Sequence, residues 1–161
     1  MSAHTPWKPS APPALLPMMQ VRCEVDALVS LGPGPCGERR YVPLAGGSVV
    51  GPELNGTVVA GGVDWQLQRA DGVLEIGAHY VIRTNDGALV EVRSDGLRHG
   101  PPEVMVRLAA GEPVARDAYF FRTLMRFTTG DARWLHLNKV MAIASGERQA
   151  RLVVLDVWRL A

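Results

Sequence analysis

Two turn dipeptides constrain the fold of this chain more than any other feature. Asp71-Gly72 and Asp86-Gly87 each separate two segments that are rich in Val, Ile, Leu and Tyr. Asp-Gly between such segments is the strongest short-range signal of a β-hairpin, because both residues tolerate the backbone conformations of a tight turn. Two hairpins in succession predict an antiparallel meander, with strands at 57–69, 73–84 and 88–94.

Further strand signals lie on both sides of this meander. Apolar and polar residues alternate with a period of two, which is typical of a half-buried strand. The additional predicted strands are 20–30, 38–43, 119–129, 139–146 and 151–160. Many evenly spaced strands indicate an all-β fold, either a sandwich or a closed antiparallel β-barrel. We favour the barrel because closure removes exposed strand edges.

Signs of helix are few. Pro102 before residues 104–110, with Gly111 directly after them, favours one short helix there, and a strand is the alternative. Asp131 is expected to cap a single helical turn that contains Trp134. The predicted barrel therefore carries one or two short helices.

Length and composition fit one domain preceded by an arm. A chain of 161 residues buries about 70% of its unfolded surface when it folds, which is enough for one sizeable core. Residues 1–17 are rich in proline, which neither builds a helix nor pairs inside a sheet. We expect an N-terminal arm at 1–17, with Trp7 as its candidate anchor, and a single β-barrel domain at 18–161.

Charge and hydropathy argue against nucleic acid and membranes as partners. Lys and Arg number 17 against 16 for Asp and Glu, so no broad basic field is expected. No apolar run reaches the roughly 20 residues of a membrane span. Residues 15–19 are too short and too interrupted by proline for a signal-peptide core, so we expect a cytoplasmic protein. Cys23 and Cys36 are then expected to be reduced.

Short motifs predict neither a cofactor nor a metal. Residues 32–37 match the Gly-x-Gly-x-x-Gly dinucleotide pattern, but Pro33 and Pro35 have no N–H to offer a pyrophosphate. We expect a rigid loop there. The four histidines and two cysteines lack the spacing of a zinc site, and no serine lies in a Gly-x-Ser-x-Gly context.

Alternation assigns side chains to the two faces of the predicted strands. Tyr80 and Thr84 share one face, and the same parity places Ser94 of the next strand with them. Gly61-Gly62 indicates a bulge, because glycine inside a strand usually marks one. Bulges re-aim the side chains that follow, so Asp64 is the leading candidate for a functional residue.

The opposite faces are expected to lie outside. Trp65 follows Asp64 and is therefore predicted on the outer surface. Val153, Leu155 and Val157 share one face of the last strand, and we expect that face to point outward. Outward apolar side chains of this kind favour a homo-oligomer, either a dimer or a tetramer.

Several ordered motifs resemble one known family. They are Gly-Glu-Arg-Arg-Tyr-Val-Pro at 37–43, Gly-Gly-Val-Asp-Trp-Gln at 61–66, Arg-Ala-Asp-Gly at 69–72, Thr-Asn-Asp-Gly at 84–87, Gly-Leu-Arg-His-Gly-Pro at 96–101 and Tyr-Phe-Phe-Arg-Thr at 119–123. From about residue 20 to the C-terminus, the chain resembles the domain of unknown function 3237 family, also called uncharacterised protein family 0311. The resemblance implies a lipocalin-like, or calycin-like, β-barrel with an internal cavity and no established common activity.

The resemblance also implies a role in metabolism. Family members occur among metabolic and natural-product genes. This chain departs from the family pattern at Asn85, Ser94, Met125, Thr128 and His136. Changes of polarity and volume around a cavity indicate a changed ligand.

Polar side chains that alternation or the family motifs place near the cavity form the candidate site. The candidate catalytic residues are Asp64, His136, Arg122 and Arg98. Asp64 and His136 are expected to exchange protons, and an arginine to hold an oxyanion. The candidate ligand-binding residues are Gln66, Tyr80, Thr84, Ser94, Thr123 and Asn138.

These residues leave two functions open. The first is a cofactor-free acid–base catalyst, such as a cyclase, isomerase, Michael-type or hydrolytic enzyme, acting on a small enolisable or aromatic metabolite inside the barrel. The second is a non-catalytic carrier of such a metabolite. If Asp64 lies inside, either its pKa rises or Arg98 or Arg122 partners it, and a purely structural ion pair is the simplest alternative.

Overall fold

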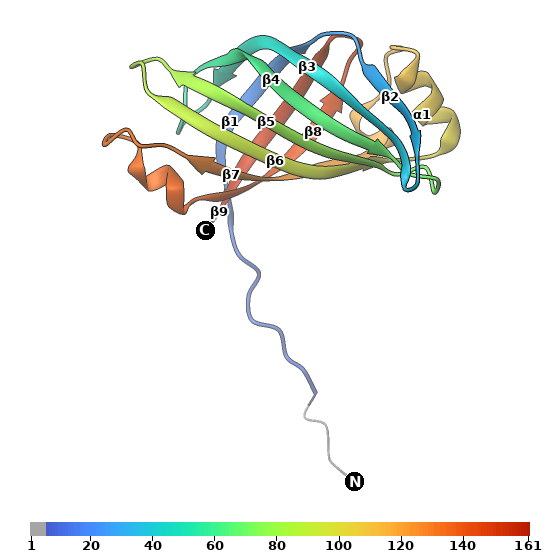
Figure 1. Ribbon diagram of the computed structural model, residues 1–161. Coiled ribbons are helices and arrows are strands. Elements are labelled where there is room, and N and C mark those ends of the chain that lie inside the picture. The colour runs from blue at the N-terminus through green and yellow to red at the C-terminus, as the bar shows by residue number, and fades with distance from the viewer. Residues whose placement is uncertain (1–5) are drawn as a thin grey trace.

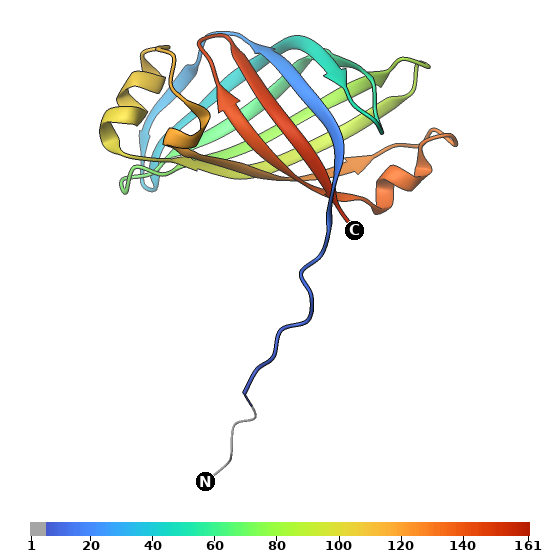
Figure 2. The same ribbon diagram turned by 180° about the vertical axis from the view of Figure 1, so that it is seen from behind.

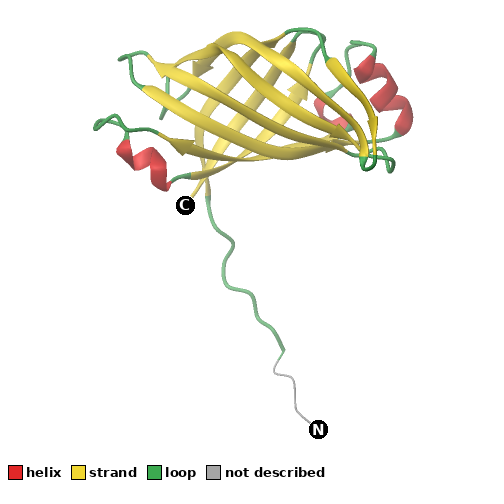
Figure 3. Cartoon of the chain, in the orientation of Figure 1, coloured by secondary structure: helices red, strands yellow, loops and turns green. Residues whose placement is uncertain are grey.

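The computed structural model describes residues 6–161 (Figures 1 and 3). The strands in this part of the chain are β1 (Leu15–Val25), β2 (Val29–Gly34), β3 (Gly37–Val50), β4 (Gly56–Gln68), β5 (Leu74–Thr84), β6 (Leu89–His99), β7 (Phe120–Thr128), β8 (Met141–Arg148) and β9 (Leu152–Leu160). The helices are α1 (Pro102–Ala109) and the short 3-10 helices η1 (Arg116–Ala118) and η2 (Leu135–Lys139). Residues 1–5 of the predicted arm, which include His4, lie outside the described residues.

The strands form one antiparallel sheet that closes on itself. Their order is β1-β9-β8-β7-β6-β5-β4-β3-β2, and β1 also pairs with β3. This last pairing closes the ring of eight strands, while β2 pairs with the first part of β3 outside the ring. The closed antiparallel β-barrel is therefore confirmed, and so is the meander of β4, β5 and β6.

The predicted bulge in β4 is also present. The register between β4 and β5 shifts at Gly61 and Gly62. Gly61 has a φ of 105°, a conformation that favours glycine, and a Cβ at Gly62 would lie only 2.5 Å from the Cβ of Tyr80. The bulge therefore depends on glycine at both positions, and it sets the direction of Asp64 two residues later.

The first strands differ from the prediction in their boundaries. The predicted strand 20–30 is two strands, since β1 ends at Val25 and β2 begins at Val29. β1 begins earlier than expected, so residues 15–17, which we assigned to the arm, pair with β9. Pro17 is tolerated because the register of this pair is irregular next to it, where a ladder hydrogen bond is not required.

Three further assignments differ from the prediction. β3 does not end at Pro43 but runs to Val50, because a register shift after Pro43 accommodates the missing donor. Residues 32–37 are not a separate rigid loop, since they form the end of β2 and its hairpin turn into β3. β6 continues beyond residue 94 to His99, which places Arg98 in a strand.

The predicted helix at 104–110 is confirmed as α1. Pro102 occupies its first turn and Gly111 follows its end with a φ of 76°. The helical turn near Trp134 is present as η2, which begins one residue later at Leu135 and has no side-chain cap. Asp131 instead accepts a hydrogen bond from the backbone N–H of Arg133, at 3.0 Å, in the turn before it.

The core fills the barrel interior, and its position corrects one prediction. Val153, Leu155 and Val157 point inward rather than outward, since Leu155 and Val157 are buried core residues and Val153 packs against them. Both faces of β9 are apolar, so alternation alone separated the faces without showing which one lies inside. These residues cannot form an oligomer interface, and the homo-oligomer stays a prediction without their support. Trp65 lies on the outer face as predicted, with its ring centroid 5.2 Å from that of Tyr41.

The two ends of the barrel carry different structures. Figures 1 and 2 show α1 at one end, near the β4–β5 and β2–β3 turns, and η2 at the opposite end near the β5–β6 turn. The extended N-terminal segment leaves the barrel beside the C-terminus, where the Ala161 N–H donates to the Ala14 carbonyl at 3.0 Å. Trp7 in this segment is 86% exposed, so it is not anchored on the barrel. Within residues 6–161, no helix has the length and apolar character to cross a membrane.

Candidate functional site

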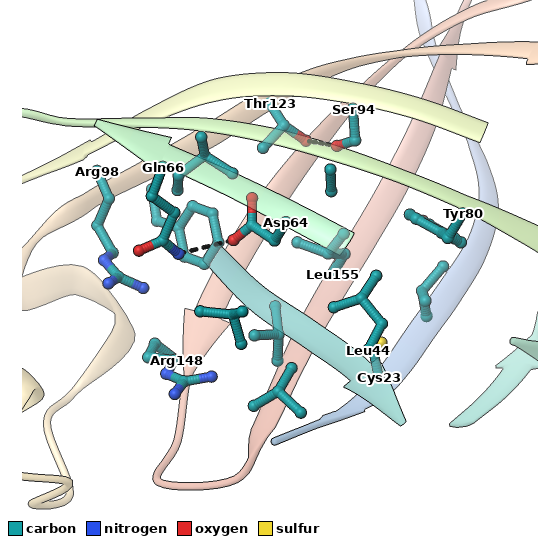
Figure 4. Close-up of a pocket in the computed structure, with 17 residues that line it drawn as sticks. Cys23, Leu44, Asp64, Gln66, Tyr80, Ser94, Arg98, Thr123, Arg148 and Leu155 are labelled. Carbon is teal, nitrogen blue, oxygen red and sulfur yellow. Dashed lines mark hydrogen bonds between the residues drawn. The ribbon is translucent and has the colours of Figure 1, made fainter. Parts of the chain in front are cut away.

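A cavity opens inside the barrel toward the α1 end (Figure 4). Its volume is about 50 Å³, and most of its walls are apolar. The polar or ionisable lining residues are Cys23, Asp64, Gln66, Tyr80, Ser94, Arg98, Thr123 and Arg148. The apolar ones are Val21, Val25, Val42, Leu44, Ile76, Ala78, Phe121, Val153 and Leu155. Outside this cavity, at the same end, lies a hollow of about 900 Å³ that α1 helps to line.

Asp64 is held in the cavity by its strand neighbours. The bulge before it and the two-residue period of β4 place Asp64 and Gln66 on the same inward face. The Gln66 amide donates to Asp64 Oδ2 at 2.7 Å, and Arg40 Nε donates to the Gln66 carbonyl oxygen at 3.1 Å. This chain of hydrogen bonds fixes the carboxyl group and leaves its other oxygen, Oδ1, buried without a protein partner.

Burial raises the pKa of Asp64. The cavity walls keep water away and so disfavour the ionised form. The hydrogen bond from Gln66, the charge of Arg98, the nearby backbone N–H of Gly77 and the charge of Arg148 act in the opposite direction, but the loss of hydration is the larger effect. Asp64 therefore keeps a proton at higher pH than an ordinary aspartic acid.

Two arginines lie on one side of Asp64 in Figure 4. Arg98 comes from the end of β6 and Arg148 from the end of β8. Arg98 lies with its guanidinium carbon 5.5 Å from the centroid of the Phe121 ring, and its Nε is buried without a partner. Burial, with the nearby charge of Arg148, lowers the pKa of Arg98 to about 10. Burial likewise lowers the pKa of Arg148.

The cavity lining also contains neutral polar groups. Ser94 Oγ donates to Thr123 Oγ1 at 3.0 Å, a buried pair between β6 and β7. Tyr80 is buried, and its hydroxyl has no partner. Burial raises the pKa of Tyr80, and it raises that of the nearby Cys23 thiol to about 12, so both groups stay neutral. Cys36 is also a free thiol but lies exposed in the β2–β3 turn.

The structure brings together six residues that the sequence nominated for the site. They are Asp64, Gln66, Tyr80, Ser94, Arg98 and Thr123. Within residues 6–161, no ion pair involves Asp64, so Asp64 and Arg98 do not form a direct ion pair. The carboxyl group and the guanidinium therefore remain available to a ligand.

Four nominated residues lie elsewhere. His136 is exposed on η2 at the opposite end, where it packs beside Trp134 with ring centroids 5.9 Å apart. Arg122 points outward from β7, over the Phe120 ring. Thr84 is buried but bonds to the β5–β6 turn, accepting a hydrogen bond from the Ala88 N–H at 2.9 Å. These positions remove the expected proton exchange between Asp64 and His136, and they exclude Arg122 as a partner of Asp64.

Asn138 is the fourth of these residues. Its side chain accepts a hydrogen bond from the Thr129 N–H at 3.0 Å and donates to the Thr129 carbonyl at 2.9 Å. It therefore holds the loop between β7 and η2 and takes no part in the cavity.

The sequence reasoning missed Arg148 and Arg40. Arg148 follows Ala142, Ala144 and Gly146 at intervals of two on β8, all buried, so alternation pointed inward at this position. We ended that strand at residue 146, so the signal was not used. The strand of Arg40 lies beside β4, where the Arg40 side chain reaches Gln66.

Three buried polar atoms without partners gather in this one cavity. In residues 6–161 the buried side-chain nitrogen and oxygen atoms without a hydrogen bond are Asp64 Oδ1, Tyr80 Oη and Arg98 Nε. Each unsatisfied group costs about 1–3 kcal/mol, and native proteins contain few of them. All three residues line this one cavity, which makes it the candidate functional site.

The fold and this cavity define a class of protein, a small closed β-barrel with an acidic and a basic group inside one end. Within that class, the chain belongs to the family described as "Protein of unknown function (DUF3237)", whose sequence pattern matches residues 13–160. The family resemblance inferred from the motifs is thereby confirmed. In residues 6–161, no group of three or more His, Cys, Asp or Glu side chains is arranged to hold a metal ion.

Similar proteins extend over most of the chain. A UPF0311 protein of Rhodopseudomonas palustris is 37% identical over 140 residues, which is 87% of this chain and 92% of that protein. The crystal structure of a conserved protein of unknown function from Rhodopseudomonas palustris superimposes with a TM-score of 0.91 at 33% identity, over 94% of this chain and 100% of that one. The hydroalkoxylation enzyme phnH of Penicillium herquei is 45% identical over 117 residues, which is 73% of this chain and 63% of that enzyme.

Proposed function

We propose that this protein is a cofactor-free acid–base catalyst that adds a hydroxyl group of a small unsaturated substrate across a carbon–carbon double bond. The observation that carries the proposal is Asp64, whose Oδ1 is buried in an apolar cavity without a protein partner. Because burial also raises the pKa of this carboxyl group, it exchanges protons closer to neutral pH than an ordinary aspartic acid does.

One oxygen of Asp64 suffices for the chemistry. Oδ2 is held by Gln66 at 2.7 Å, so Oδ1 faces the substrate. Ionised Asp64 takes the proton of the substrate hydroxyl, and the hydroxyl oxygen forms a bond to one carbon of a conjugated double bond. The electron pair of that double bond moves to give an enolate. The enolate then takes the proton back from Asp64 at the neighbouring carbon, so the reaction is balanced.

A buried donor for the enolate oxygen lies on either side of Asp64 in Figure 4, with Arg98 on one side and Tyr80 on the other. Arg98 Nε and Tyr80 Oη are buried donors without partners, and both line the cavity with Asp64. Donors that are fixed before the reaction stabilise a developing negative charge without reorganising, and such donors contribute about 2.7–4 kcal/mol each in studied enzymes. The same groups explain why an enolisable substrate suits this cavity.

The relative from Penicillium herquei supports this choice among acid–base reactions. Its name specifies hydroalkoxylation, the addition of an O–H group across a double bond, and it is 45% identical to this chain over 117 residues. The aligned part covers 63% of that enzyme, so it supports the class of reaction rather than a particular substrate.

The test is ring closure in heavy water. The purified protein is incubated with a panel of ortho-hydroxyaryl enones, and we expect a protein-dependent cyclic ether that is enriched in one enantiomer and carries one deuterium. Asp64→Asn should lower the rate by at least about a hundredfold, the lower range for loss of a general acid or base. Asp86→Asn, at the opposite end, is the matched control and should retain the wild-type rate.

The alternative is a carrier without catalysis. The cavity of about 50 Å³ is small, and its unpartnered groups require a ligand but not a reaction. Tight binding of a panel compound without protein-dependent product would favour the carrier over the enzyme, whereas full turnover in a folded Asp64→Asn protein would remove Asp64 from the chemistry.

A further inference from the structure

Arg98 and Arg148 stand at the passage between the two spaces of the α1 end. Both side chains line the inner cavity, and both also line the outer hollow. Figure 4 shows their guanidinium groups on the same side of Asp64. A molecule that enters the cavity from the hollow therefore passes between two cationic side chains.

These two charges have no counter-ion in the described part of the chain. Neither arginine takes part in any of its ion pairs. The Arg148 guanidinium donates to the backbone carbonyl of Ala150, at 3.2 Å, and Arg98 lies against the Phe121 ring. Asp64 is the one carboxylate among the cavity lining residues, and it accepts its hydrogen bond from the Gln66 amide rather than from an arginine. Positive charge therefore exceeds negative charge at the passage.

The acidic residues of the outer hollow do not neutralise it. Asp71 is paired with Arg69, and Asp26 lies 3.7 Å from Arg151. Each of these carboxylates already has its own arginine at the rim. Two adjacent, partly buried cations without a counter-ion are a costly arrangement unless an anion joins them.

We infer that the substrate is an organic oxyanion on an apolar skeleton, with its charged oxygens bound between Arg98 and Arg148. Guanidinium groups bind carboxylates and related oxyanions through paired, charge-assisted hydrogen bonds. This inference deepens the proposed function by naming its substrate class, and it rests on that function only for the claim that the bound anion then reacts at Asp64.

The sizes of the two spaces give the orientation. The inner cavity of about 50 Å³ holds only a small part of a metabolite, whereas the hollow of about 900 Å³ holds the rest. Leu74, Met105 and Leu108 line the hollow and offer apolar contact to a skeleton. The reacting end therefore extends past the arginines to Asp64, while the bulk of the skeleton lies against α1.

The experiment is equilibrium binding by calorimetry in the Asp64→Asn protein, which separates binding from turnover. The probes are 1-naphthoate, the neutral isostere 1-naphthamide, and 1-naphthol. We expect 1-naphthoate to bind at least about tenfold more tightly than 1-naphthamide, and its affinity to fall with added salt, because the contact is a charge-assisted one. If 1-naphthol binds more tightly than 1-naphthoate and also depends on Arg98, the oxyanion is a phenolate or enolate, which also supports the inference.

Arginine variants locate the anion. Arg98→Met and Arg148→Met should each weaken 1-naphthoate at least about tenfold and leave 1-naphthamide unchanged. Arg122→Met, which removes an outward-facing arginine, is the control and should change neither affinity. Arg98→Lys keeps the charge but not the paired geometry, and should give a smaller loss if the methionine variant does not fold.

The outcomes separate the two proposals. Equal binding of the naphthoate and the amide, or wild-type naphthoate affinity in both arginine variants, would overturn the oxyanion inference. Arginine-dependent binding of 1-naphthoate together with no turnover in the wild-type panel would retain the inference and remove the catalytic function. Turnover that requires Asp64 but not Arg98 or Arg148 would retain the catalytic function and remove the oxyanion inference.

Discussion

At the η2 end of the barrel, Asp86 accepts hydrogen bonds from the Thr84 hydroxyl and the Trp134 indole and pairs with Arg133 at 3.3 Å. At the α1 end, Asp64 keeps one oxygen without any protein partner. The first carboxylate has a lowered pKa because donors surround it, and the second has a raised pKa because water is excluded. The carboxylate at the η2 end is bonded by the chain itself, and the carboxyl group at the α1 end has an oxygen without a protein hydrogen bond.

β5 contains both arrangements on one inward face. Tyr80 and Thr84 are four residues apart on this strand and are both buried. The Thr84 hydroxyl is bonded to Asp86 and to the Ala88 N–H, whereas the Tyr80 hydroxyl has no partner. The difference between the two ends of the barrel is therefore present within β5, between Tyr80 and Thr84. Substitutions at these two positions can test it.

The largest contrast is expected from removing these two hydroxyl groups. Thr84→Val should lower the free energy of unfolding by about 1–3 kcal/mol, because it leaves the buried Ala88 N–H without its acceptor. Tyr80→Phe should raise it by up to about 1 kcal/mol, because it removes a buried group that has no partner. Urea denaturation of the two variants measures both changes. Equal destabilisation by Tyr80→Phe would show that its hydroxyl is bonded in the folded protein.

A second contrast concerns pH. The side chain of Arg133 lowers the pKa of Asp131 to about 2 at the η2 end. The folded pKa lies below the unfolded value of about 3.9, so this carboxylate contributes stability above that value and loses it as the pH falls toward 2. Asp64 has a folded pKa above its unfolded value, so its contribution is present below about pH 3.9 and is lost as the pH rises through the folded pKa.

Variants at the two ends should therefore respond oppositely to pH. Asp64→Asn should gain stability relative to wild type as the pH rises above about 4. Asp131→Asn should be less stable than wild type above about pH 4, and this difference in stability should disappear as the pH falls toward 2. Denaturation midpoints measured across this range give both slopes. A flat difference between Asp64→Asn and wild type would mean that the pKa of Asp64 is the same in the folded and unfolded chain.

The smallest effect is expected at two polar residues outside the cavity. His136→Ala and Arg122→Ala should change turnover and ligand affinity by less than about twofold, because both side chains are exposed and neither lines the cavity. The steady-state rate with any substrate found for the wild type measures this. A loss comparable to that of Asp64→Asn would move part of the chemistry outside the barrel cavity.

Much of the fold could be predicted from local signals. The Asp-Gly turns, the alternation in β5 and β6 and the glycine pair before Asp64 each depend on a few adjacent residues, and each is present in the structure. The alternation of side chains also placed Tyr80 and Ser94 correctly on the inward face of their strands. The errors at the start of β1 and the end of β3 came from prolines, because these strands tolerate Pro17 and Pro43 at irregular registers that the sequence does not reveal.

The candidate site was predicted only in part, because it depends on which strand ends meet. His136 and Asp64 were paired on chemistry, but the barrel places η2 and the cavity at opposite ends. Arg148 was missed although its parity pointed inward, because we ended its strand at residue 146, and only the structure places it near Arg98 from β6.

The sequence by itself determined the strands, the turns and the alternation that puts a carboxyl group inside, because these follow from backbone preferences and from periods of two residues. Only the tertiary structure decided which apolar face of β9 lies inside, and which arginines share the passage with Asp64. The physical reason is closure. Pairing β1 with β3 fixes the register of the whole ring at once, and that register selects the side chains from distant strands that meet at each end.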